Sequence, residues 1–140
     1  MRALFAAALA LLVVACGSDA TPASALSGTL KYTRSGGIAG VSVGTTIKAD
    51  GSATFDDRRN GQRKAKLTKA ERDRLTRLVR AADLTHVKAD GKSECCDQFE
   101  YSLTYRGRTL RWSDAHFPKP LTKLSAELER LITKYGSGPG

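Results

Sequence analysis

Histidine and cysteine are scarce in this sequence, which limits the chemistry that its side chains can support. The 140 residues include two histidines and three cysteines. His86 and His116 have no metal-ligand spacing to the cysteines, so no metal site is expected. The sequence also lacks a nucleophile elbow, a phosphate-binding loop and a cofactor fingerprint. We therefore expect a protein that is not an enzyme and that uses no cofactor.

Acidic residues are also few, with 14 aspartates and glutamates against 23 lysines and arginines. None of the acids forms a pair typical of general acid–base catalysis. Asp56 and Asp57 lie in a basic segment, and Glu127 and Glu129 are predicted on a helix surface. An excess of basic residues often indicates nucleic-acid binding. The N-terminus nevertheless has the form of an export signal, so nucleic acid is not an expected partner.

That export signal resembles the one carried by bacterial lipoproteins. Arg2 supplies a positive start, and residues 3–15 form an apolar run too short to span roughly 30 Å of hydrocarbon. The run ends in Val-Val-Ala-Cys at Cys16, which resembles a lipobox, the motif in which the cysteine is lipidated and becomes the new N-terminus. We expect a signal peptide at residues 1–15 and a lipid on Cys16. The lipid would anchor the chain at the extracytoplasmic face of a bacterial cell membrane.

The rest of the chain divides into a tether, one domain and a tail. Residues 16–27 are rich in Gly, Ser, Ala, Thr and Pro, which predicts a flexible tether after the lipidated cysteine. Residues 28–136 suffice for a single domain with a modest core. Residues 137–140 are expected to be a loose tail, and the protein is expected to be a monomer.

Two features of the domain have alternative interpretations. Cys95 and Cys96 are adjacent, and Cα atoms about 3.8 Å apart fall below the usual disulfide span. The two cysteines either form a strained vicinal disulfide or remain as two partly buried thiols. A disulfide would make the turn redox-sensitive or would only make the loop rigid. A candidate basic patch either keeps the protein soluble or binds anionic wall polymers, lipid headgroups or an acidic protein. Its residues are Arg58, Arg59, Arg63, Lys64, Arg72 and Arg77.

Residue patterning predicts an α+β domain. Alternation of apolar and polar residues predicts about five strands, three before a first helix and two before a second. Thr68 and Glu71 have the spacing of a capping box, and the helix that they begin extends to about Ala82. Residues 56–66 are predicted to be a solvated loop. Two amphipathic helices would cover one face of an antiparallel sheet.

Two hairpin registers follow from matching apolar residues across each turn. A three-residue loop with a left-handed Gly51, and a two-residue loop at Arg106-Gly107, keep apolar partners together. The predicted pairs are Ile47 with Ala53, Thr45 with Phe55, Leu103 with Leu110, Tyr101 with Trp112, and Thr104 with Thr109.

A glycine-rich segment between the first two strands is not explained by folding alone. Glycine permits positive φ and close backbone approach, and the single bulky residue of the segment, Ile38, has no predicted core partner. The segment is either a floppy hairpin connection or a loop that docks into another molecule. It comprises Ser35, Gly36, Gly37, Ile38, Ala39 and Gly40.

This loop, the capped Leu-rich helix and the strand Asp97-Gln-Phe-Glu-Tyr-Ser-Leu-Thr-Tyr105 together resemble the emfourin family. Its members are small proteinaceous inhibitors of thermolysin-like zinc metalloproteases. The resemblance covers roughly residues 30–135. It implies that residues 35–40 form the inhibitory loop and that a thermolysin-like protease is the partner. Such enzymes favour a bulky apolar residue just after the scissile bond, so Ile38 would fill that pocket.

The alternative function is that of a cell-envelope domain that inhibits no protease. Such a domain would use the basic patch to bind anionic wall polymers or lipids. Salt-dependent binding that is lost when those residues are neutralised would favour this alternative.

Overall fold

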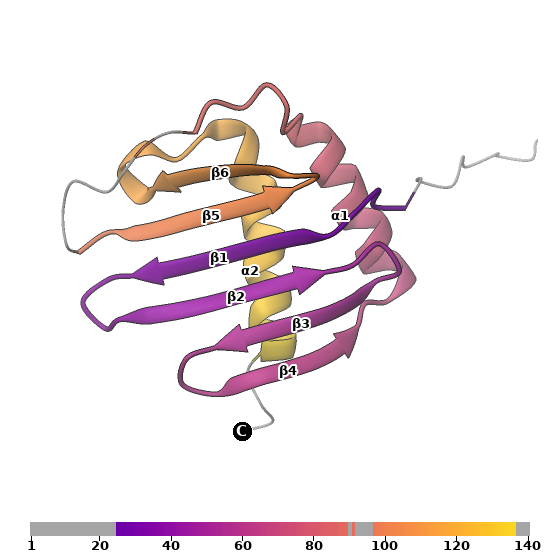
Figure 1. The fold of residues 1–140 in the computed structure, drawn as a ribbon, viewed down its shortest axis with the longest axis horizontal. Helices are drawn as coiled ribbons and strands as arrows, with labels where there is room; N and C mark the ends of the chain where they lie inside the picture. The colour runs from indigo at the N-terminus through magenta and orange to yellow at the C-terminus, as the bar shows by residue number, and fades with distance from the viewer. Residues whose placement is uncertain (1–24, 90, 92–96, 137–140) are drawn as a thin grey trace, which may run out of the picture.

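Six antiparallel strands form one sheet in the order β4-β3-β2-β1-β5-β6 (Figure 1). The computed structural model of the protein describes residues 25–89, 91 and 97–136. The strands are β1 (Leu30–Gly36), β2 (Val41–Ile47), β3 (Ser52–Asp57), β4 (Gly61–Lys66), β5 (Phe99–Tyr105) and β6 (Arg108–Ser113). The helices are α1 (Lys69–Ala82), α2 (Thr122–Gly136) and two short 3₁₀ helices, η1 (Asp114–His116) and η2 (Lys119–Leu121). The α+β class is as predicted.

The sixth strand is β4, which lies in residues predicted to be a solvated loop. It pairs with β3 from Ser52↔Lys66 to Asp57↔Gly61 and occupies an edge of the sheet. Its sequence, Gly-Gln-Arg-Lys-Ala-Lys, has no fully buried side chain. An edge strand with charged side chains buries little apolar surface, so it lacks the alternating pattern on which the prediction relied. The expected count of about five strands was therefore one too low.

Both predicted hairpin registers are confirmed. In the first, Ile47 lies opposite Ala53, and the left-handed Gly51 (φ +83°) donates its N–H to Lys48 O at 2.9 Å. In the second, Leu103 lies opposite Leu110 and Tyr101 opposite Trp112. The predicted partners Thr45 and Phe55, and Thr104 and Thr109, are also paired.

The hydrophobic core lies between one face of the sheet and the two helices, which lie behind the sheet in Figure 1. Both helices contribute apolar stripes with the predicted spacing of an amphipathic helix. Fully buried residues of the sheet include Leu30, Tyr32, Ile47, Phe55, Leu103 and Trp112, and those of the helices include Leu75, Leu124, Leu128 and Leu131. The alternate residues of the strands are mostly threonine, serine and charged residues and form the opposite face.

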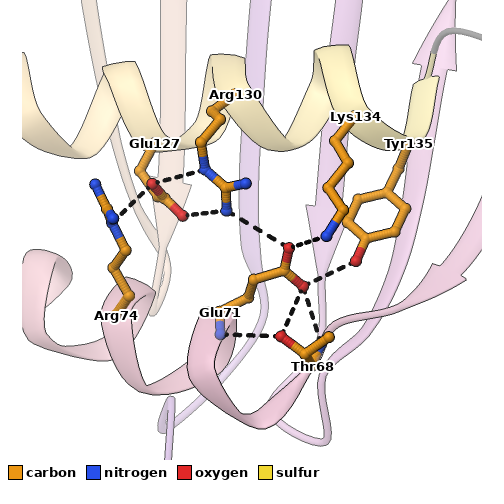
Figure 2. Close-up of polar contacts among 7 residues, drawn as sticks. All are labelled: Thr68, Glu71, Arg74, Glu127, Arg130, Lys134 and Tyr135. Atoms are coloured by element: carbon orange, nitrogen blue, oxygen red, sulfur yellow. Dashed lines mark hydrogen bonds and ion pairs between the residues drawn. The ribbon is translucent and has the colours of Figure 1, made fainter.

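The capping box at the start of α1 is confirmed and extends into a contact with α2 (Figure 2). The Glu71 carboxylate accepts hydrogen bonds from the Thr68 N–H at 3.0 Å, Lys134 Nζ at 2.7 Å and Tyr135 Oη at 2.8 Å. Burial alone raises the pKa of Glu71, but the bonds from Lys134, Thr68 and Tyr135 outweigh it and lower the pKa to about 2. A helix cap thus also fixes the packing of α1 on α2.

Glu127 was predicted on a helix surface, but it is buried, with 2% of its surface exposed. It lies on the side of α2 that faces α1, between Arg130 Nη2 at 2.7 Å and Arg74 Nε at 2.9 Å (Figure 2). A buried carboxylate needs such charged partners. The positions of Arg74 and Arg130 are therefore explained by the packing of the two helices.

Several predictions concern residues outside the described part of the chain. These are the signal peptide at residues 1–15, the lipid on Cys16, most of the tether, the cysteine pair at Cys95 and Cys96, and the tail at 137–140. They remain predictions. Within the described residues, no helix is long and apolar enough to cross a membrane.

Candidate functional site

The glycine-rich loop is a four-residue turn, shorter than the six residues predicted. Ser35 pairs with Ser42 and Gly36 with Val41, so both Ser35 and Gly36 belong to β1. Residues 37–40 form the turn, which is closed by a hydrogen bond from Gly40 N to Gly37 O at 3.0 Å. Gly37 (φ +68°) and Gly40 (φ +57°) both have a left-handed backbone. Glycine adopts this conformation without a steric penalty, which lets the chain reverse within four residues.

Ile38 lies at the tip of this turn and is 91% exposed. It is the one large hydrophobic side chain classed as exposed among residues 25–89, 91 and 97–136. Its backbone N–H and C=O have no hydrogen-bond partner among those residues. The turn therefore presents one apolar side chain together with free backbone groups, which is what a partner cleft would need to bind.

The base of the turn packs against the beginning of β5. Gly37 N donates to Gln98 O at 3.2 Å. A Cβ at Gly36 would lie 2.5 Å from Gln98 O, and one at Gly37 would lie 3.0 Å from the Phe99 ring. These glycines are therefore required by the packing of the protein itself, and not only by access to a partner.

Phe99, in turn, is held from two sides. The Arg34 guanidinium lies 5.0 Å from the centre of its ring and forms an ion pair with Glu129 of α2 at 3.3 Å. Asp114 accepts hydrogen bonds from the Phe99 N–H at 3.0 Å and from Tyr101 Oη at 2.7 Å. Burial and the bond to Asp114 raise the pKa of Tyr101, so its hydroxyl stays protonated as a donor. The turn is thus connected through Phe99 to Arg34, which is paired with Glu129 of α2, and to Asp114.

The neighbouring turn between β3 and β4 supports the tip from the other side. Arg59 Nη2 donates to Ala39 O at 3.2 Å, and Arg58 N donates to Ser42 O at 2.9 Å. Hydrogen bonds from the Arg59 N–H and the Asn60 side chain lower the pKa of Asp57, so the carboxylate that shapes this turn is ionised. The Ile38 turn is therefore bonded to a flanking segment on each side.

The supported turn belongs to the part of the sequence that identifies the family. The family model Emfourin matches residues 32–129, which include the turn, Arg59 and Phe99. The chain belongs to the emfourin family. Emfourins are metalloprotease inhibitors, so membership assigns this chain to an inhibitor family and not to an enzyme family. No curated protein matches the sequence.

In this emfourin the six residues of the candidate basic patch lie on three different elements. Arg58 and Arg59 lie in the turn beside Ile38. On β4, Arg63 is opposite the buried Phe55, and Lys64 is opposite Thr54, so their side chains point to opposite faces. Arg72 lies on α1 against Gly51, at the other end of β3, and Arg77 lies further along the same helix. The structure does not bring the six residues together.

The described residues of this emfourin contain no group of three or more His, Cys, Asp or Glu side chains that could hold a metal ion. The site is instead defined by the Ile38 side chain and by the segments that support its turn. Arg34, Phe99 and Asp114 were not identified as functional from the sequence, and Arg59 was predicted only as a member of the candidate basic patch. Their roles beside the Ile38 turn depend on the pairing of β1 with β5 and of β3 with β4, neither of which was predicted.

Proposed function

We propose that the chain inhibits thermolysin-like zinc metalloproteases by inserting the turn at residues 37–40 into the substrate cleft. The observation that carries this proposal is the exposure of Ile38 at the tip of a turn held on both sides. Burial of an Ile side chain contributes about 1.5–3 kcal/mol. A turn that is already ordered loses little conformational entropy on binding, so more of this energy contributes to affinity.

The backbone of the turn supports the same proposal. The free N–H and C=O of Ile38 can pair with the backbone of an enzyme that normally binds an extended substrate. Gly37 and Gly40 have no side chains that would keep an enzyme wall at a distance. The Ala39 carbonyl is already bonded to Arg59, so it is not available for pairing with the enzyme.

We further propose that the protein acts at the outer face of a bacterial membrane, through a lipid on Cys16. The support is the Val-Val-Ala-Cys sequence that follows an apolar run at residues 3–15. A multiply acylated cysteine would give stable anchoring, which a single chain does not.

The direct test mixes the full chain with several secreted thermolysin-like proteases and measures hydrolysis of a peptide substrate. We expect hydrolysis to fall to near zero as the inhibitor reaches equimolar concentration with at least one of these enzymes. A serine protease assayed with the same substrate is the control and should keep its full rate. Full activity of every thermolysin-like enzyme at a large excess of the chain would contradict the proposal.

The envelope-binding alternative receives less support, because the six basic residues on which it was based do not form one surface.

A further inference from the structure

The end of the sheet opposite the Ile38 turn carries a groove of about 620 Å³ lined by three arginines. Leu30, the first residue of β1, pairs with Tyr105, the last residue of β5, whereas Gly36 pairs with Phe99 at the other end. Seven residues of strand separate the two ends by about 20 Å. Arg80 lines the groove from α1, and Arg106 and Arg108 line it from the β5–β6 hairpin.

The positive charge in this groove is not neutralised within the described residues. Arg108 is held by two backbone carbonyls, those of Thr85 and Val87, and has no carboxylate partner. Arg80 and Arg106 are exposed and form no ion pair with a described residue. Three guanidinium groups therefore face one acidic lining residue, an aspartate at the end of α1.

That acidic residue, Asp83, is engaged with its neighbours. Its carboxylate accepts a hydrogen bond from Thr85 Oγ1 at 2.7 Å and lies 2.8 Å from His86 Nδ1. The single carboxylate of Asp83 therefore cannot neutralise all three arginines. The groove retains the charge needed to attract an anion.

Arg106 also has an unusual backbone conformation for its residue type. Its φ is +51°, in the left-handed region that favours glycine and asparagine. The two-residue turn that it forms with Gly107 is one in which Asn-Gly is the preferred sequence. An arginine at this position places a positive charge at the rim of the groove despite the conformational cost.

The chain enters the domain at this groove. Ser27 donates its backbone N–H to Tyr105 Oη at 3.1 Å. The groove is also lined by Leu26 and Val79, which are buried in the core, and by the partly buried Leu84. Nine residues lead from Cys16 to Ala25, so they can span at most about 30 Å. A lipid on Cys16 would therefore keep this end of the domain close to the bilayer.

We infer that this groove binds the headgroup phosphate of anionic phospholipids and so orients the domain on the membrane. The inference rests on the proposed lipid anchor. Guanidinium groups bind phosphate through paired, charge-assisted hydrogen bonds, and basic side chains within a Debye length of an anionic leaflet are attracted to it. Bound in this way, the domain directs the Ile38 turn away from the membrane.

The test is hydrogen–deuterium exchange of the full chain with vesicles of phosphatidylcholine, with or without about 30% phosphatidylglycerol. We expect the anionic vesicles to slow amide exchange at residues 84–87 and 105–108 by about threefold or more. Exchange at residues 37–40 should not change. The protection should disappear in 0.5 M salt. The double variant Arg80→Gln/Arg106→Asn should lose it, since asparagine keeps the left-handed turn but removes the charge.

The matched control is Lys64→Gln/Lys123→Gln, which removes the same charge at two exposed positions outside the groove and should retain the protection. Loss of protection in both variants would show an effect of net charge only, and would overturn the inference. The inference would also be overturned if amide exchange were equal with the two kinds of vesicle. Protection by a soluble polyglycerol phosphate equal to that by anionic vesicles would overturn it as well. Mass spectrometry of the same protein, produced in a bacterial host, shows whether Cys16 is acylated. This measurement distinguishes absence of the lipid anchor from absence of headgroup binding.

Discussion

Replacement of Ile38 by aspartate is expected to raise the inhibition constant for a thermolysin-like protease by about 100-fold or more. The variant loses about 1.5–3 kcal/mol of apolar burial and also places a charge in an apolar pocket. Each 1.4 kcal/mol corresponds to a tenfold change in affinity. Because Ile38 is 91% exposed, the melting temperature of the free protein should remain unchanged. Substrate hydrolysis and thermal unfolding measure the two quantities.

Two further variants serve as controls for this result. Ile38→Leu keeps a bulky apolar side chain and should inhibit within about fivefold of the wild type. Ala81→Asp adds the same charge at an exposed position of α1 and should leave the inhibition constant within about twofold. An unchanged inhibition constant for Ile38→Asp would contradict insertion of the turn into the cleft.

The second large effect is expected from Glu71→Gln, which should lower the free energy of unfolding by about 2–4 kcal/mol. The carboxylate accepts bonds from Thr68, Lys134 and Tyr135 and lies 3.5 Å from Arg130 Nη2, so its loss leaves several donors without an anion (Figure 2). For a domain of this size the melting temperature should fall by roughly 10 °C or more. Asp73→Asn, which breaks the exposed pair with Lys69, should change it by no more than about 2 °C.

The pH dependence of stability tests the same carboxylate. The pKa of Glu71 is lowered to about 2 in the folded protein, whereas an unfolded glutamate titrates near pH 4.3. Its contribution is therefore fully present above about pH 4.3 and is lost as the pH falls toward 2. The difference in unfolding free energy between the wild type and Glu71→Gln should shrink over that window. A difference that stays constant from pH 6 to pH 2.5 would show that the ionised carboxylate is not responsible.

Local patterns were sufficient to predict most of the fold. The two hairpin registers depend on residues close in sequence, such as Ile47 and Ala53, and each alternative register would have paired apolar with polar residues. The capping box at Thr68 is a four-residue signal. By contrast, the sequence of β4 has no alternation of apolar and polar residues, because most of its side chains are charged or polar. The burial of Glu127 was not predicted, because its partner Arg74 comes from another helix.

The candidate site was predictable in composition but not in geometry. The glycines and the single apolar residue of the turn indicated a binding loop, and Ile38 is indeed exposed. The bounds of the turn and its supports depend on the pairing of Gly36 with Phe99, residues more than sixty positions apart. No local pattern reports such a pairing. The roles of Arg34, Phe99 and Arg59 therefore emerge only from the folded structure.

The most direct test of the central claim is competition for the substrate cleft of a thermolysin-like protease. The apparent dissociation constant of the full chain is measured with increasing amounts of a small zinc-binding inhibitor that fills the cleft. If the Ile38 turn occupies the cleft, the apparent constant should rise in proportion to the concentration of the small inhibitor. An apparent constant that does not change when the cleft is filled would contradict the claim.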